Sequence, residues 1–300
     1  MKKYIYLILS IVPLFSCEDV IDVELQSAET RLVVNGLLRV DFSQEFVPVE
    51  IRVSETTSFF ENNVPTTLDN NAVIFYGQPD PNAPEILENL ATSSLTEMES
   101  GSGIYVPDPT FDADQRIRTQ SILPNTVFIL IFEHKGRRYV ARTPFSSTVP
   151  IENLEQGDET LFDEDDIEIK ITFTDTPDVE NYYVFDFGES EFLALDDQFI
   201  DGQEFEFSYF PERDLEAGNE LEVSILGADQ EFFNYMDLLV EQTENDGGVF
   251  DTPAVTVRGN IFDVTGLDNE LIFDNVNRPN DFPLGYFAVV QEYKESLVIE

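Results

Sequence analysis

Apolar and polar residues alternate with a period of two along much of this 300-residue chain. Valine and isoleucine take every second position in 47–53, and isoleucine and phenylalanine do so in 167–173. The segments 205–209 and 221–225 repeat the pattern. Successive side chains of a β-strand point to opposite faces, so the pattern predicts strands with one buried face. The chain must therefore bury most of its apolar surface on sheets.

Other segments are almost continuously apolar, which predicts strands covered on both faces. They are Leu32–Val34, Ala72–Tyr76, Val127–Phe132, Tyr182–Phe187 and Tyr286–Val290. Lys135-Gly136 and Asp201-Gly202 each predict a tight hairpin turn, whereas the Pro-, Asn- and Asp-rich segment Gly77–Pro84 predicts an exposed loop. Many short strands separated by turn signals are typical of β-sandwiches and barrels.

One segment, Asp229–Glu244, has helical periodicity instead. Its apolar residues recur at three- and four-residue spacing, which predicts an amphipathic helix with one buried side. Asp229 suits the N-cap, Glu231 suits the first turn, and the Asn-Asp-Gly-Gly run at 245–248 suits the end. The aromatic stripe of this helix is a candidate ligand face, but burial against a sheet is the more common role of such a stripe.

We expect an all-β fold of two β-sandwich domains, immunoglobulin-like or prealbumin-like, with this helix in the second. The segment Pro144–Pro150 predicts the boundary, so the domains would span residues 31–147 and 148–300. An acid-rich loop, Glu155–Glu168, follows the boundary.

The N-terminus has the pattern of a bacterial lipoprotein signal peptide. Two lysines precede an apolar run, Tyr4–Phe15, that is shorter than the roughly 20 residues needed to span a bilayer. Leu14-Phe15-Ser16-Cys17 resembles a lipobox, with cleavage after residue 16 and acylation of Cys17. A plain secreted protein with an unmodified cysteine is the alternative. Since Cys17 is the chain's one cysteine and falls at the predicted cleavage point, lipid anchoring is favoured.

Residues 17–30 form an acidic tether between the predicted anchor and the first domain. Glu18, Asp19, Asp22 and Glu24 resemble the surface-export signal of Bacteroidota lipoproteins. A solvated acidic spacer is the simpler interpretation, and the two are compatible. The sequence therefore predicts a lipid-anchored outer-membrane protein. The acids favour the cell surface over the periplasmic face.

The composition excludes several function classes. Sixty Asp and Glu against 16 Lys and Arg give a net charge of −44, which repels phosphate backbones and argues against nucleic acid as a partner. One Cys allows no internal disulfide, and one His allows no Cys/His zinc cluster. The single histidine, His134, lies in the predicted turn His-Lys-Gly-Arg and is expected to be solvated.

Neither a nucleophile-elbow motif nor a phosphate-binding glycine loop is present in the sequence. A pair of carboxylates remains the one catalytic option, as in a glycoside hydrolase. With sixty acids most pairs are surface pairs, so we expect no enzyme, no catalytic residue and no cofactor. The acidic run that contains Asp163, Asp165 and Asp166 is a weak candidate for Ca²⁺, although an EF-hand's spacing and glycine are missing.

Several segments together resemble one family of Bacteroidota lipoproteins, the domain of unknown function 4249. The matching segments are Cys17–Val23, Leu32–Gly36, Thr143–Pro150, Asn181-Tyr182-Tyr183, Gly259-Asn260-Ile261 and Pro283–Phe287. Genes of this family commonly lie beside TonB-dependent receptors of the SusC kind. The resemblance therefore implies a lipoprotein that works with such a transporter, and it implies no catalytic residues.

Three functions follow as hypotheses. The first is a non-enzymatic accessory subunit of an outer-membrane transporter or similar envelope complex, acting in substrate capture or as a lid. The second is a structural or adhesive immunoglobulin-like lipoprotein that binds another protein through a sheet edge or loops. The third and least favoured is a carboxylate-based hydrolase.

Lipidation at Cys17 gives the first testable prediction. Metabolic labelling with an alkyne-bearing fatty acid should label the wild-type protein in the membrane fraction, and Cys17→Ala should lose both the label and the anchor. Ser16→Ala, which keeps a small residue before the cleavage point, should still be labelled. A label that persists in Cys17→Ala would exclude this site.

Overall fold

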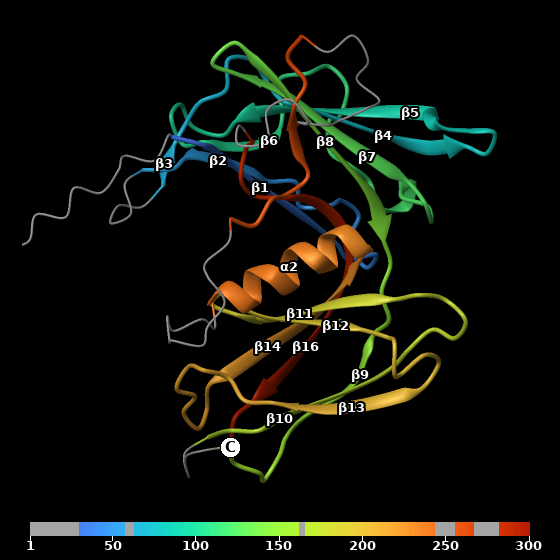
Figure 1. The fold of residues 1–300 in the computed structure, drawn as a ribbon, viewed down its shortest axis with the longest axis vertical. Coiled ribbons are helices and arrows are strands. Elements are labelled where there is room, and N and C mark those ends of the chain that lie inside the picture. Colours follow the sequence, from blue (N-terminus) through green and yellow to red (C-terminus); the bar gives the residue numbers. More distant parts are fainter. Residues whose placement is uncertain (1–29, 58–62, 162–165, 244–255, 267–281) are drawn as a thin grey trace, which may run out of the picture.

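The computed structural model describes residues 30–57, 63–161, 166–243, 256–266 and 282–300. Within these ranges the chain is nearly all β with a single α-helix, which confirms the expected class (Figure 1). Residues 1–29 lie outside the described residues, and with them the predicted signal peptide, Cys17 and all but the last residue of the predicted tether at 17–30; Asp163 and Asp165 also lie outside. Among the described helices, none has the length and apolar content needed to cross a bilayer.

The strands are numbered along the chain. The N-terminal half contributes β1 (Leu32–Val40), β2 (Ile51–Glu55), β3 (Val64–Pro65), β4 (Val73–Asp80), β5 (Ala83–Glu97), β6 (Ile104–Pro107), the 3₁₀ turn η1 (Thr119–Ser121), β7 (Val127–His134) and β8 (Arg137–Ser146). The C-terminal half contributes β9 (Ile151–Gln156), β10 (Ile169–Thr174), β11 (Tyr182–Gly188), β12 (Glu191–Asp196), β13 (Glu204–Tyr209), β14 (Glu220–Ala228), α2 (Gln230–Thr243), β15 (Ile261–Asp263) and β16 (Phe287–Val298).

The last strand, β16, takes part in both halves of the molecule. Residues 287–291 pair in parallel with β1, and Val289 and Val290 also pair with β8. The remainder, 292–298, pairs antiparallel with β14. We call β1–β8, β15 and residues 287–291 the upper lobe. We call β9–β14, α2 and residues 292–298 the lower lobe (Figure 1).

In the upper lobe the pairings close a circuit. The order runs β16-β1-β2-β6-β5-β4-β7-β8 and returns to β16, while β15 pairs with the other end of β8. Inside the circuit lies one core cluster, to which β16 contributes Phe287 and Val289 and β15 contributes Ile261. The predicted strand 47–53 is buried at each of its apolar positions, although regular pairing begins only at Ile51.

The lower lobe has two sheets and a helix. β12, β11, β14 and β16 form one sheet, and β13, β10 and β9 form the other. Alternate residues of β11, namely Tyr183, Phe185 and Phe187, pack with Phe173 of β10 in a second core cluster. The opposite face of β11 and β14 is covered by α2 through Phe232 and Met236. Both faces of these strands are thus buried. The nearly continuous apolar run of β11 predicts this, whereas the alternation in 221–225 predicts a single buried face for β14 and misses the cover that α2 provides.

Two local predictions are corrected. Gly77–Pro84 is not a loop: β4 continues to Asp80 and β5 begins at Ala83, with a register shift at Tyr76–Gln78 that lets the hairpin continue past the irregular sequence. Asp201-Gly202 is not a hairpin, because β12 pairs with β11 whereas β13 pairs with β10. The turn there carries the chain from one sheet to the other.

The turn at Lys135-Gly136 is confirmed. β7 and β8 pair up to His134 and Arg137, and the two turn residues have φ angles of 50° and 71°. Positive φ at both central positions is the requirement of a type I′ hairpin, which glycine meets without strain.

Arg39 of β1 joins the two lobes electrostatically. Its guanidinium lies 2.5 Å from the Asp186 carboxylate on β11 and 2.9 Å from the Glu292 carboxylate on β16. Burial alone would lower the pKa of Arg39, but the hydrogen bonds and the attraction to Asp186 and Glu292 outweigh it and raise the pKa. Glu292 is only 6% exposed, so losing the guanidinium would leave a buried carboxylate poorly compensated.

We predict that Arg39→Ala lowers the free energy of unfolding by about 2 kcal/mol, because two charge-assisted hydrogen bonds are lost at a partly buried site. Arg52→Ala is the matched control. The guanidinium of Arg52 is 67% exposed and bonds the exposed Glu50, so its loss should cost less than about 1 kcal/mol. Urea unfolding measures both. Equal losses in the two variants would contradict a special role for Arg39.

Candidate functional site

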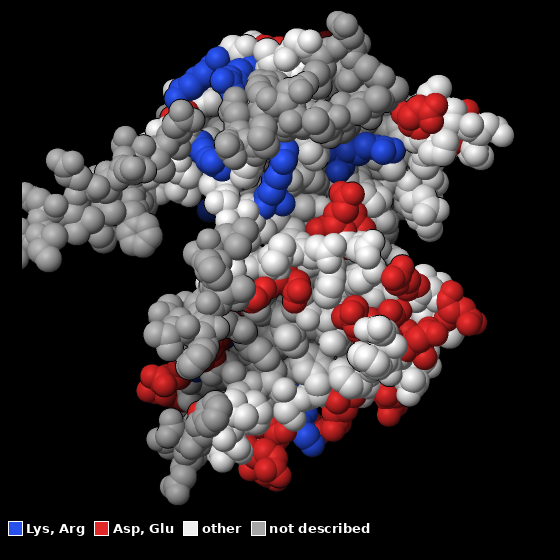
Figure 2. Space-filling model, viewed as in Figure 1, with Lys and Arg blue, Asp and Glu red and all other residues white. Residues whose placement is uncertain are grey.

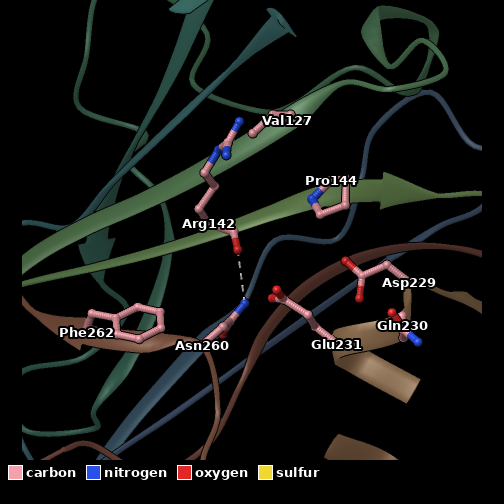
Figure 3. A pocket seen from close by; sticks show the side chains of 8 residues that line it. All are labelled: Val127, Arg142, Pro144, Asp229, Gln230, Glu231, Asn260 and Phe262. Atoms are coloured by element: carbon pink, nitrogen blue, oxygen red, sulfur yellow. Dashed lines mark hydrogen bonds between the residues drawn. The ribbon is translucent and has the colours of Figure 1, made fainter. Parts of the chain in front are cut away.

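A pocket of about 560 Å³ lies where the start of α2 meets the upper lobe (Figure 3). It is built from three separated segments of the chain. Its lining consists of Val127, Arg142 and Pro144 from β7 and β8, Asp229, Gln230 and Glu231 at the start of α2, and Asn260 and Phe262 at β15. The pocket therefore depends on how the two lobes are held together.

The acidic side of the pocket comes from the helix start. Asp229 is the N-cap, as predicted, since its Oδ1 accepts a hydrogen bond from the Phe232 amide at 2.7 Å. Burial raises the pKa of Asp229, the Phe232 bond opposes this change, and the charge of Glu231 adds to it. In Figure 3 the Asp229 and Glu231 carboxylates both project toward Pro144 and Asn260.

The other walls of the pocket are apolar side chains and one arginine that is already hydrogen-bonded elsewhere. Val127, Pro144 and Phe262 supply apolar surface. The Arg142 guanidinium points away from the two carboxylates in Figure 3 and donates to the Pro84 carbonyl at 3.3 Å. The pocket thus offers a partly desolvated acidic side beside an apolar side, an arrangement suited to a ligand with an amine or hydroxyl group and an apolar body.

Asn260 has a structural role at the floor of this pocket. Its side-chain amide donates to the Phe287 carbonyl at 2.7 Å and its side-chain oxygen accepts from the Phe287 amide at 2.9 Å. The same amide reaches the Arg142 carbonyl at 3.3 Å, as the dashed line in Figure 3 marks. Asn260 therefore clamps the start of β16 to β8.

Two glycines pack this clamp against β1. A Cβ on Gly259 would lie 1.6 Å from the Gly285 carbonyl oxygen, and a Cβ on Gly285 would lie 2.0 Å from the Val34 carbonyl oxygen. Gly285 also has a φ of 89°, which disfavours any other residue. The Gly-Asn-Ile and Leu-Gly-Tyr-Phe segments that carry the family resemblance thus form a backbone junction.

His134 contradicts the expectation of a solvated turn residue. Its side chain is 5% exposed, with Nε2 2.8 Å from the Glu55 carboxylate and Nδ1 3.2 Å from the Thr67 carbonyl. The turn itself is exposed, but His134 is the last residue of β7 and its ring points inward. Sequence position alone gave no signal of this, because Glu55 and Thr67 come from distant segments.

Of the three predicted calcium ligands, only Asp166 lies among the described residues. Asp163 and Asp165 lie outside the described residues, and Asp166 accepts a hydrogen bond from the Leu161 amide at 3.1 Å. A different group, Asp175, Asp197 and Asp201, brings three carboxylates within 4.8 Å of one another. Sequence reasoning missed it because Asp175 follows β10, whereas Asp197 and Asp201 lie in the connection between β12 and β13.

Each of these three carboxylates accepts a hydrogen bond from a backbone amide. Gly202 donates to Asp175 at 2.8 Å, Asn181 donates to Asp197 at 2.7 Å, and Asp178 donates to Asp201 at 2.9 Å. The Tyr183 hydroxyl also donates to Asp175. The cluster ties together the loops at one end of the lower lobe, and its oxygens are of the kind that a hard cation takes.

The fold and the sites define a β-rich chain whose last strand joins two lobes, with a pocket at the junction. The model of one family, described as "Domain of unknown function (DUF4249)", matches residues 18–295. The chain belongs to this family. A comparison with curated proteins finds no match.

If the Gly-Asn-Ile segment is a structural clamp, Asn260→Ala should lower the free energy of unfolding by about 2–3 kcal/mol, because the Phe287 amide and carbonyl lose buried partners. Asn70→Ala is the control, since Asn70 is exposed and bonds Glu133, and it should change stability by no more than about 0.5 kcal/mol. Thermal and urea unfolding compare the two. An unchanged stability in Asn260→Ala would refute the clamp.

Proposed function

We propose that this chain is a non-enzymatic outer-membrane lipoprotein that serves as an accessory subunit of a TonB-dependent, SusC-like transporter or a similar envelope complex. The observation that carries the proposal is the lipobox-like segment ending in Cys17, followed directly by a family match that begins at residue 18. In this proposal a lipid on Cys17 anchors the protein in the outer membrane, and residues 17–30 tether the folded part to that anchor.

The proposed architecture is two β-sandwich domains, immunoglobulin-like or prealbumin-like, at 31–147 and 148–300, with β15 and residues 287–291 of the second segment paired into the first. The pairing of β16 with β1, β8 and β14 and the contacts of Arg39 support a rigid connection between them. A rigid body on a short tether could act as a lid or hold cargo near a pore. The pocket between α2 and β8 is the proposed capture site, with Asp229 and Glu231 as its polar contacts.

The net charge of −44 supports electrostatic steering toward a partner that presents basic loops on the cell surface. Such docking should weaken as salt is added, because exposed charges are screened. Nucleic acid is not a proposed partner. Bound Ca²⁺ is at most a weak accessory, either at the acidic run that includes Asp166 or at the Asp175 cluster.

The structural or adhesive alternative is favoured by one observation. β5 pairs with β6 only at Leu95, Thr96 and Glu97, so the outer edge of its first part has no strand beside it among the described residues. Ile86 and Leu90 on this part are 56% and 54% exposed. A partner strand could add there, although the Pro84 ring and the bulge at Asn89 work against edge pairing.

The hydrolase alternative would place its carboxylate pair at Asp229 and Glu231. Asp229 is already used as the helix cap, which weakens this alternative. Reviving it would require an activity that Glu231→Gln abolishes while the fold stays intact.

The test is extraction of the native protein from its membrane in mild detergent with a tag in the exposed β5–β6 turn at Gly101, where a Cβ would meet nothing within 4 Å. A TonB-dependent barrel should be recovered in stoichiometric amount and should dissociate at high salt. The untagged strain is the control. Recovery of the protein alone, or with a different envelope machine, would overturn the transporter role and favour the structural one.

A further inference from the structure

Positive charge gathers on one lobe of this acidic protein. In Figure 2 most of the visible Lys and Arg side chains lie over the upper lobe, while patches of Asp and Glu side chains are scattered over the lower lobe's visible face. On the upper lobe a second pocket, of about 290 Å³, is lined by Arg31, His134, Lys135 and Arg137, and Glu55 is the one carboxylate that the described residues contribute to its lining. In a chain with 60 acids and 16 bases, such a lining is a marked reversal of composition.

Arg31 is held rigidly at this pocket. Its backbone amide donates to the Thr56 hydroxyl at 2.8 Å, and its carbonyl accepts from the Thr56 amide at 2.8 Å. Its guanidinium stacks on the Phe282 ring, 4.5 Å from the centroid. Arg258 approaches the same ring at 4.9 Å. The aromatic ring therefore fixes Arg31 and draws a second cation toward the site.

One nitrogen of the Arg31 guanidinium, Nη1, is buried without a hydrogen-bond acceptor among the described residues. A buried guanidinium N–H without an acceptor is costly, and native proteins rarely retain one. The arrangement therefore points to an acceptor that a ligand would bring.

The neighbouring cations set the charge of that ligand. The Lys135 ammonium lies 2.5 Å from Glu55, which also contacts His134, and the Arg137 guanidinium lies 3.3 Å from Asp263. The pocket lining thus presents the cationic side chains of Arg31, Lys135 and Arg137 beside the Glu55 carboxylate. An anion placed among Arg31, Lys135 and Arg137 would be attracted by all three.

We propose that this pocket binds a phosphate group, with the Arg31 guanidinium as its main contact. A tetrahedral oxyanion can accept hydrogen bonds from several directions, which matches cations arriving from the start of β1, the β7–β8 turn and β8. The phosphate could belong to a lipid headgroup or be free in solution. The lipid source rests on the proposed anchoring at Cys17, whereas the site itself does not.

Chain length makes the lipid source accessible. Arg31 follows Cys17 by 14 positions, which at full extension span at most about 50 Å. An acyl chain on Cys17 would therefore keep the pocket close to the headgroups of its own membrane.

The test uses the full-length lipoprotein in phosphate-free, non-ionic detergent and titrates it calorimetrically with inorganic phosphate, dihexanoyl phosphatidic acid and acetate. Wild-type protein should bind one phosphate group per chain, and Arg31→Gln should bind about tenfold more weakly or not at all. Arg116→Gln is the matched control and should bind normally, because Arg116 is exposed, pairs with Asp114 and lies beyond the opposite end of β1.

The outcomes separate the sources. Tighter binding of phosphatidic acid than of inorganic phosphate assigns the site to a lipid headgroup, and the reverse assigns it to free phosphate. Equal binding of acetate, absence of binding, or binding that survives in Arg31→Gln overturns the proposal. If Arg31→Gln fails to fold, Lys135→Gln at a 65% exposed side chain replaces it and should weaken binding severalfold. None of these results depends on whether a transporter co-purifies.

Discussion

The pairing of one strand with both lobes is the constraint on which the rest of the structure depends. Residues 287–291 of β16 complete the upper circuit between β1 and β8, and residues 292–298 complete the lower sheet beside β14. The same strand contributes side chains to the upper core through Phe287 and Val289 and to the helix-covered core through Ala288 and Val290. Neither lobe has a full sheet without it, so their stabilities are coupled.

This constraint gives a structural role to the two C-terminal segments of the family resemblance. Gly259 and Gly285 let backbone segments approach more closely than side chains would allow, and the Asn260 side chain bonds the Phe287 backbone. They fix the point at which β16 enters the upper lobe. The pocket beside α2 is a consequence of the same junction, because Asn260 forms its floor while the helix that follows β14 forms its acidic wall.

Local pattern was sufficient to predict much of this fold. Alternation identified β10 and β14, continuous apolar runs identified β7 and β11, and Asp229 was correctly expected to cap the helix. Long-range pairing was not predictable in this way, because β1 and β16 lie about 250 residues apart and no local signal encodes their register. For the same reason the inward ring of His134 and the cluster around Asp175 were missed.

The candidate sites also differ in whether a local sequence pattern or a long-range association defines them. Lipidation of Cys17 is a prediction from a linear motif, and Cys17 lies outside the described residues. Both pockets combine segments that only the fold brings together, so no local pattern in the sequence marked their residues as a site. The linear motif bears on the predicted membrane anchoring, whereas the two pockets bear on which ligands the protein would bind.

The Lys and Arg side chains are distributed unevenly between the two lobes, and this asymmetry would orient the molecule relative to a charged membrane. Among the described Lys and Arg residues, only Lys170, Arg213 and Lys294 lie in the lower lobe, whereas Arg31, at the start of the described residues, lies in the upper lobe. Near an anionic membrane surface, the lower lobe is repelled more strongly than the upper lobe, whose Lys and Arg side chains offset more of its acids, over a Debye length of about 8 Å. A lipid at Cys17 would then hold the protein with Arg31 toward the membrane and with α2 and the lower lobe directed outward. In that orientation the acidic pocket between the lobes faces away from the lipid phosphates, where an amine-bearing cargo or a basic loop of a partner could reach it.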